Sequence, residues 1–291
     1  MKTNRRERAL ACLHGLTVGD AFGSQFFVPS NRTNLEQRQL PAGPWQWTDD
    51  TEMACSVFAA LQQNGHINQD SLAESFASHH DFDRGYGPAM NRMLRLVRAG
   101  QDWRTLAAEL FEGQGSWGNG AAMRVAPLGA WFADDLSKVA EQAALSAAVT
   151  HTHPDGIAAA IAVAVATAVA PESLPPRDFL DTVLQWTPPG RVHQGMRAAR
   201  GLAHVSSAKI AVHELGNGRL TAGWDTVPFA LWAAARNLDD FEEALWVTAQ
   251  TGGDVDTTCA IVGGVVAVRS GVPAAWAAQC EELPSWARAQ N

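Results

Sequence analysis

The chain has 291 residues, of which 22 are lysine or arginine and 30 are aspartate or glutamate, so its formal net charge is −8 at pH 7. This acidic balance argues against a nucleic acid as the main partner, because proteins that bind the phosphate backbone usually carry a basic face. Apolar residues make up 46% of the chain and charged residues 18%, which excludes a disordered protein and predicts a substantial core.

The N-terminal segment and the longest apolar run both predict a protein that does not enter a membrane. Residues 1–23 open with charged side chains and lack the uninterrupted apolar stretch of a signal peptide. The run 157–170 is shorter than the roughly 20 residues that cross a bilayer. The four cysteines form no CxxC pair, which is typical of free thiols in a reducing compartment. We therefore expect a soluble, cytoplasmic protein without a membrane partner.

Hydrophobic residues recur at helical spacing along most of the chain, and the alternation typical of strands is nearly absent. A first helix is expected to end at Asp20. No connecting segment is long or polar enough to mark a domain boundary, so we expect one all-α domain over residues 1–291, a compact helical bundle. Further segments expected to be helical are residues 53–61, 103–111, 139–149, 157–170, 241–248 and 259–268.

Two acidic clusters stand directly before predicted helices. Residues 47–52 read WTDDTE, and residues 252–258 read GGDVDTT. Each cluster combines two carboxylates with a threonine hydroxyl, and such an all-oxygen set suits Mg²⁺ or Mn²⁺ better than zinc. If the clusters meet in the fold, two divalent cations would balance their four carboxylates. The spacing does not establish that they meet.

A structural interpretation of the same clusters stays open. Acidic residues are favoured in the first turn of a helix by the helix dipole, and the acids at 239–243 are read in that way. Asp49 and Glu52 also have the spacing of a capping box, with Asp49 as the cap.

The remaining motifs are weaker. Residues 113–118 match GxGxxG, but the preceding residues are helical, whereas a dinucleotide fingerprint requires a strand there. The loop could instead offer backbone N–H groups to a phosphate. His151 and His153 have no third zinc ligand at suitable spacing, so a polar lining or capping role is favoured. Asp20 is read as a helix-end polar residue or a supporting acid, and Asp83 as part of a turn or of a substrate edge.

Taken together, six segments resemble the ADP-ribosylglycohydrolase family, in the family's order and over nearly the whole chain. The paired TDD and GGDxDT motifs are highly specific, whereas either alone would be weak. The segments are GLTVGDAFGSQFF (15–27), WTDDTEMA (47–54), DRGYGPAM (83–90), GSWGNGAAMRVAPLG (115–129), THTHPDG (150–156) and GGDVDTTCAIVGGVVA (252–267).

The resemblance implies an all-α fold with a binuclear Mg²⁺ or Mn²⁺ site in a central cleft that binds ADP-ribose. Two sets of residues then follow. The implied metal ligands are Thr48, Asp49, Asp50, Asp254, Asp256 and Thr257. The residues implied to line the substrate cleft are Ser116, Trp117, Gly118, Asn119, Gly120, Met123 and His151, with Trp117 near the adenine.

The activity implied is hydrolysis of the glycosidic bond between ADP-ribose and an acceptor, either a protein side chain or a small molecule. Nucleic acid enters only as an ADP-ribosylated acceptor. Such cleavage passes through oxocarbenium-like charge that carboxylates stabilise. Asp254 is the first candidate for activating water, and Asp83 is a weaker candidate for contacting the leaving group.

One position departs from the family's pattern. Many relatives carry a glutamate four residues after the second glycine of GDAxG, and this chain has Phe27 there. The departure leaves the metal motifs intact but motivates an alternative, a protein that binds ADP-ribose or a nucleotide without turnover. A helical domain that has lost its ligand is the third hypothesis. The acceptor linkage and the choice between Mg²⁺ and Mn²⁺ stay open.

Overall fold

The computed structural model describes residues 4–287, and every regular element in that range is helical. The only strand-like pairings among these residues are two isolated bridges, Trp45 with Cys280 and Gly118 with Ala222. The expected all-α fold is therefore confirmed. Within the described range, no helix combines the length and apolarity needed to cross a membrane. In chain order the helices are α1 (Arg5–Ser24), η1 (Gln25–Phe27), η2 (Pro29–Asn31), α2 (Arg32–Gln37), α3 (Asp49–Asn64), α4 (Gln69–His79), η3 (Phe82–Arg84), α5 (Pro88–Arg98), α6 (Trp103–Gly113), α7 (Gly120–Met123), α8 (Ala126–Trp131), α9 (Leu136–Ala148), α10 (Pro154–Val169), α11 (Pro176–Trp186), α12 (Arg191–Gly201), α13 (Ala208–Leu215), α14 (Gly223–Arg236), α15 (Phe241–Ala249), α16 (Val255–Ser270) and α17 (Ala274–Ala277).

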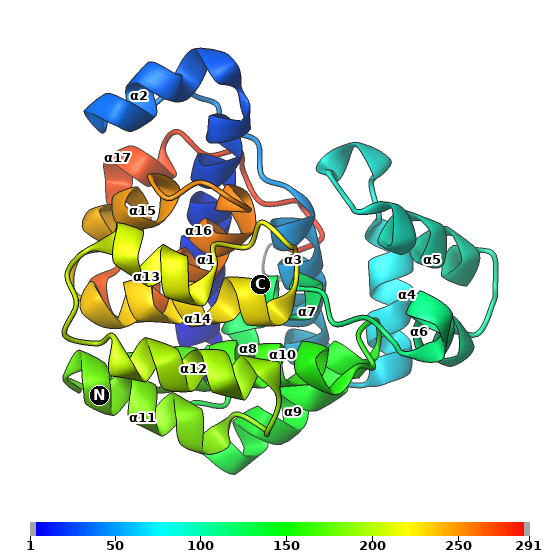
Figure 1. Cartoon of the computed structure of the whole chain (residues 1–291). Helices are drawn as coiled ribbons and strands as arrows, with labels where there is room; N and C mark the ends of the chain where they lie inside the picture. Colours follow the sequence, from blue (N-terminus) through cyan, green and yellow to red (C-terminus); the bar gives the residue numbers. More distant parts are fainter. Residues whose placement is uncertain (1–3, 288–291) are drawn as a thin grey trace.

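Helices α1 and α16 pack with their backbones in close contact, although one begins the described chain and the other nearly ends it (Figure 1). Gly15, Gly19 and Gly23 lie one turn apart on the face of α1 that meets α16. A Cβ atom at Gly19 would collide with the carbonyl of Cys259, and one at Gly23 with the carbonyl of Val255. The missing side chains thus let the two helices approach.

Both helices differ from their expected bounds. The first helix continues past Asp20 to Ser24, so Asp20 lies inside α1 and is fully buried. The last apolar helix begins at Val255 rather than at residue 259, which places Asp256 in its first turn.

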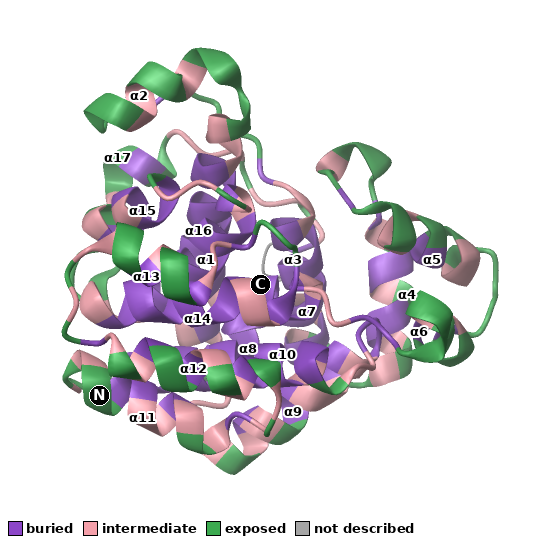
Figure 2. Cartoon of the chain, viewed as in Figure 1, coloured by how far each residue is buried: buried purple, intermediate pink, exposed green. Residues whose placement is uncertain are grey.

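Helix α10 forms the middle of the core, as its uniformly apolar sequence predicts. It packs against α8, α9 and α14, and its residues are buried almost throughout (Figure 2). The outer helices α11 and α12 are amphipathic, with exposed and buried residues alternating at helical spacing (Figure 2). Of the cysteines, Cys12, Cys55 and Cys259 are buried free thiols, and Cys280 is a half-buried one.

Helices α4, α5 and α6 form a lobe beside the main body, at the right of Figure 1. The helix expected over residues 103–111 is interrupted near its end. Phe111 has φ 52° and is 45% exposed, because the helix is broken between Leu110 and Glu112. This break turns the chain back toward the main body.

Candidate metal centre and substrate pocket

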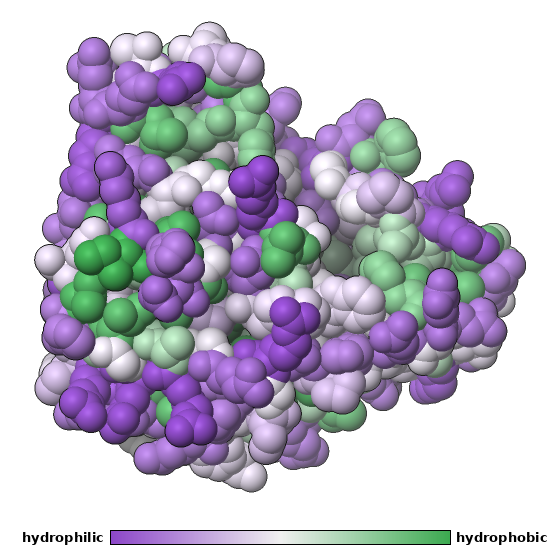
Figure 3. Space-filling model, in the orientation of Figure 1, coloured by the Kyte–Doolittle hydropathy of each residue, from purple (hydrophilic) through white to green (hydrophobic). Residues whose placement is uncertain are grey.

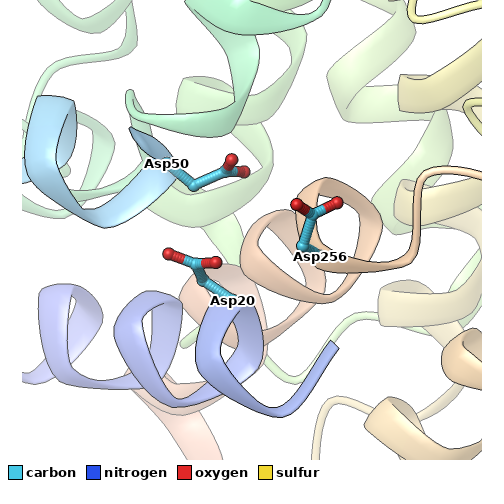
Figure 4. Close-up of side chains that lie close together, drawn as sticks. All are labelled: Asp20, Asp50 and Asp256. Carbon is cyan, nitrogen blue, oxygen red and sulfur yellow. The ribbon is translucent and has the colours of Figure 1, made fainter. Parts of the chain in front are cut away.

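Three carboxylates from distant parts of the chain converge at one point. Asp20 comes from α1, Asp50 from the first turn of α3, and Asp256 from the first turn of α16 (Figure 4). One oxygen atom of each lies within 4.8 Å of those of the other two. The Thr257 hydroxyl donates to Oδ2 of Asp50 over 3.4 Å. The two acidic clusters therefore meet.

The start of α3 shows why the capping-box interpretation is wrong. Thr48, not Asp49, caps the helix, and its hydroxyl accepts from the Asp50 N–H at 3.4 Å. Glu52 does not reach back to the cap. Instead it accepts hydrogen bonds from the Tyr86 hydroxyl at 2.7 Å and from the backbone N–H of Asp81 at 3.0 Å. Asp49 and Asp50 are consequently free of capping roles.

Asp20 holds this helix start in place. Its Oδ2 accepts from the backbone N–H of Thr48 at 2.9 Å and from both the N–H and the hydroxyl of Thr51, at 3.1 and 2.6 Å. Its Oδ1 accepts from the Thr48 hydroxyl at 2.8 Å. Asp20 is thus largely satisfied by protein donors, and it positions the cluster that contains Asp50 rather than offering an unsatisfied ligand.

Burial of so many carboxylates raises their pKa values. Desolvation raises the pKa of Asp49 to about 8, and the charge of Asp20 adds to the effect. Desolvation also raises the pKa of Asp50 and of Asp256 well above their usual range, with further contributions from neighbouring carboxylates. Without a positive partner, this site favours protonated acids.

Asp254 joins the centre from the loop before α16. Its Oδ2 accepts a 2.6 Å hydrogen bond from the side-chain amide of Asn119, which also donates to the Thr226 hydroxyl at 3.1 Å. The pKa of Asp254 is raised by burial, and the bond from Asn119 opposes that rise. Asn119 thereby ties the glycine loop to the acidic centre.

A pocket of about 400 Å³ opens beside the carboxylates, between the main body and the α4–α6 lobe. The surface is hollowed between these two parts in Figure 3. The acidic end is lined by Asp49, Asp50, Asp254, Asp256 and Thr257. Predicted cleft residues that line the same pocket are Ser116, Gly118, Asn119, Gly120, Met123 and His151.

Three predicted site residues, Trp117, Asp83 and Thr48, are not part of this lining. The ring of Trp117 lies 4.8 Å from that of Phe111, which does line the pocket. Asp83 is exposed in η3 and, like Thr48, lines a neighbouring cavity of about 510 Å³. Phe27 is 55% exposed and borders neither cavity.

Sequence reasoning missed other residues of the site. The sequence indicates Asp20 only as a possible supporting acid. Arg124, which is fully buried and lines the pocket, lies in the segment 115–129 but is not distinguished there from its neighbours. The lobe contributes Gly85, Pro88 and Met90 from the loop before α5 and from α5 itself. These three residues belong to the segment DRGYGPAM, which begins at Asp83. The motif therefore predicted a segment that lines the pocket, although Asp83 itself lies outside it.

Comparison with known proteins agrees with this geometry. The model of the ADP-ribosylglycohydrolase family matches residues 1–290. The chain belongs to that family.

Relatives of this ADP-ribosylglycohydrolase cover most of its length. An uncharacterized protein of Archaeoglobus fulgidus is 29% identical, over 93% of this chain and 90% of its own. The human ADP-ribosylhydrolase ARH3 is 28% identical, over 94% of this chain and 89% of its own. The ADP-ribosylarginine hydrolase Tri1 of Serratia proteamaculans is 23% identical, over 93% of this chain and 74% of its own. A solved ADP-ribosylglycohydrolase-related protein complex shares the fold, with a TM-score of 0.67 at 23% identity over 96% of this chain and 93% of that one.

Family membership makes the protein a glycosyl hydrolase, and its acidic centre has the donors that a hard cation needs. Oδ1 of Asp50 is buried without a hydrogen-bond partner among the described residues. An unpaired buried carboxylate oxygen is costly unless a cation or a proton neutralises it. The raised pKa values of Asp49, Asp50 and Asp256 reflect the same deficit of positive charge. The residues present therefore fit a divalent metal ion.

Proposed function

We propose that this protein releases ADP-ribose from an acceptor by hydrolysing the glycosidic bond at the distal ribose, with two Mg²⁺ or Mn²⁺ ions at the acidic centre. The observation that carries the proposal is the convergence of Asp50 and Asp256 from motifs about 200 residues apart, at the end of a pocket of about 400 Å³. The oxygen ligands would come from Thr48, Asp49, Asp50, Asp254, Asp256 and Thr257.

The bound ions would orient the ribose diol and polarise a water molecule. The protein's own contribution is to hold the carboxylates at fixed spacing. Asp20 holds the start of α3 through Thr48 and Thr51. Asn119 orients the carboxylate of Asp254. Asp254 is the candidate for accepting the proton of the attacking water, since it lies at the pocket and burial raises its pKa, which makes it a stronger base than an exposed carboxylate.

The rest of the pocket would hold the ADP-ribose moiety. Ser116 and Gly118 form one wall, and Met123 and His151 form another part of the lining. Phe111 would face the adenine end, with Trp117 packed behind it as support. Asp83 remains a candidate for contact with the acceptor, because its cavity adjoins the centre at Thr48 and Gly85.

Binding of ADP-ribose without turnover is the second candidate function. Its motive is the sequence departure at Phe27, where many relatives carry glutamate, although the structure places this side chain outside both cavities.

The decisive experiment combines a thermal shift with a turnover assay. ADP-ribose at a hundredfold excess over Kd should raise the stability by about 2.7 kcal/mol with Mg²⁺, and the shift should vanish in EDTA. Release of ADP-ribose from arginine- or serine-linked substrates then separates the hydrolase from the binding protein. No metal-dependent shift and no release would refute the proposal.

A further inference from the structure

Arg124 is a buried arginine that lines the same pocket as the acidic centre and feels the charge of Asp49, yet forms no ion pair with it. It is fully buried between α7 and α8 and makes no ion pair with any carboxylate of the described residues. Its Nε has no hydrogen-bond partner there, and Nη1 reaches only the sulfur of Met53, at 3.6 Å. The guanidinium lies over the ring of Phe76, 4.5 Å from its centroid. Burying a charge so incompletely paired is costly, which calls for a role.

The remaining contacts of Arg124 lead to the pocket. Nη2 donates to the backbone carbonyl of Ser146 at 3.1 Å and to the hydroxyl of Thr150 at 2.8 Å. The same hydroxyl lies 2.7 Å from Nδ1 of His151. Arg124, Thr150 and His151 are all buried, so water does not compete for these contacts.

The hydroxyl of Thr150 decides which ring nitrogen of His151 carries hydrogen. A guanidinium can only donate, so the hydroxyl oxygen accepts from Arg124. Within the described part of the chain, the one acceptor within reach of the hydroxyl hydrogen is Nδ1 of His151. An unprotonated Nδ1 satisfies this hydrogen, whereas a protonated Nδ1 would leave the buried hydroxyl hydrogen without an acceptor. The favoured neutral imidazole therefore carries its hydrogen on Nε2. Burial, together with the charge of Arg124, lowers the pKa of His151 to about 3, so the ring is neutral at physiological pH.

The opposite nitrogen faces the glycine loop of the pocket. A Cβ atom at Gly118 or at Gly120 would lie 3.2 Å from Nε2, so the two glycines keep this side of the ring open. The hydroxyl of Ser116 borders the same space, because it also lies 3.2 Å from a Cβ placed at Gly118. No acceptor for Nε2 exists among residues 4–287, although His151 lines the pocket.

We propose that Arg124 and Thr150 are positioning residues that fix His151 in its Nε2–H tautomer, so that the ring presents a neutral donor to an oxygen of the bound ligand. The identity of that ligand as ADP-ribose rests on the proposed function; the tautomer does not. A neutral donor suits this place because it binds an oxygen atom without adding a titrating charge beside the acidic centre.

The test uses Thr150, because variants of buried Arg124 could fail to fold. Thr150→Val keeps the shape and removes the hydroxyl, whereas Thr150→Ser keeps the hydroxyl. Thr167→Val is the matched control, since Thr167 is equally buried and its hydroxyl bonds only the Val163 carbonyl, at 2.9 Å. The ligand-free full chain is labelled with ¹⁵N-histidine. Long-range ¹H–¹⁵N spectra then distinguish protonated from unprotonated ring nitrogens, with His151 assigned through a His151→Gln variant.

We expect an unprotonated Nδ1 and a protonated Nε2 in the wild type, in Thr150→Ser and in Thr167→Val, and loss of this pattern in Thr150→Val. Titration calorimetry with ADP-ribose and Mg²⁺ should show a Kd about 3- to 10-fold higher for Thr150→Val, the range expected for one misplaced neutral hydrogen bond, and no such change in the other two variants.

A protonated Nδ1 in the wild type would overturn the inference, as would Thr150→Val binding ADP-ribose as tightly as Thr167→Val. If the wild type itself binds no ADP-ribose, the proposed function fails, and the tautomer in the spectra alone decides the inference.

Discussion

Thr257 in the first turn of α16 donates a hydrogen bond to Asp50 in the first turn of α3, across 207 residues of sequence. This contact brings the positive ends of two helix dipoles to one point. Those ends partly offset the repulsion among the carboxylates, yet the pKa of Asp50 is still raised, mainly by burial. The carboxylates that meet here therefore suit a cation.

Asp50→Asn and Asp256→Asn should each lower turnover by more than about 100-fold, because polarisation by a metal ion is worth several kcal/mol. The same variants should unfold at an equal or higher temperature than the wild type in EDTA, since each removes a carboxylate from a crowded, buried cluster. Kinetic assays and thermal unfolding on the same preparations check both parts. A folded variant with full activity would contradict the assignment.

Stability should fall with rising pH when metal is removed. The pKa of Asp49 is about 8 in the folded protein, against a usual value of 3.8. A raised pKa means that the folded state binds the proton of Asp49 more tightly than the unfolded state does. Protonation of Asp49 therefore stabilises the folded state fully below about pH 4, and this contribution is lost as the pH approaches about 8. Urea unfolding in EDTA at several pH values measures the slope. Both Mg²⁺ and the Asp49→Asn substitution should reduce the slope of unfolding free energy against pH. Equal slopes for the wild type in EDTA, the wild type with Mg²⁺ and the variant in EDTA would refute the explanation.

Thr51→Val should lower the free energy of unfolding by about 1.5–3 kcal/mol, the usual contribution of a hydrogen bond to a charged group. The Thr51 hydroxyl donates to Asp20 at 2.6 Å and is fully buried, so no water can replace it. Thr51→Ser keeps the donor and is the matched control. Equal losses in the two variants, measured by denaturant unfolding, would mean that packing rather than the bond to Asp20 matters.

Phe27→Glu should change neither stability nor turnover by much. Phe27 is 55% exposed and borders neither cavity, and substitutions at such positions usually stay within about 0.5 kcal/mol. We expect kcat to change by less than about twofold, on the same ground. A large gain in turnover would show that this position acts on the reaction through a conformation other than the one described here.

Gly19→Ala should destabilise the protein by about 1–3 kcal/mol through overpacking and weaken metal binding without altering any carboxylate. A methyl group there meets the backbone of Cys259 and would push α16 away from α1. Gly201→Ala is the control, because a Cβ atom at this last residue of α12 meets nothing within 4 Å. If both variants bind Mn²⁺ as tightly as the wild type does, the spacing of α1 and α16 does not determine the metal affinity of the acidic centre.

Local pattern was sufficient to predict the helical fold class, several of the helices and the two acidic clusters. The apolar residues of α10 and of α15 are buried as expected. Each of these helices could be predicted because its pattern lies within one stretch of sequence. The break in α6 at Phe111 could not be read in this way, since positive φ at a phenylalanine is imposed by tertiary context. Thr48 displaced Asp49 as the cap for a similar reason, because Asp20 fixes Thr48 from another helix.

The site was predicted less completely because its parts belong to different segments. The motifs gave Asp50 and Asp256, but periodicity could not show that they meet. The supporting roles of Asp20 toward Thr51, and of Asn119 toward Asp254, depend on contacts across 31 and 135 residues. Such long-range hydrogen bonds leave no local signature.

The pairing of α1 with α16 also fixes when the enzyme can become active during its synthesis. Helix α1 leaves the ribosome early, but the face formed by Gly15, Gly19 and Gly23 has no partner until residues 255–270 have been made. Contacts of such high sequence separation form late and slowly. A nascent chain that stops before residue 254 lacks Asp254, Asp256 and Thr257 as well as this packing. The acidic centre is thus assembled only when nearly the whole chain is present, and metal binding would report that synthesis has passed α16.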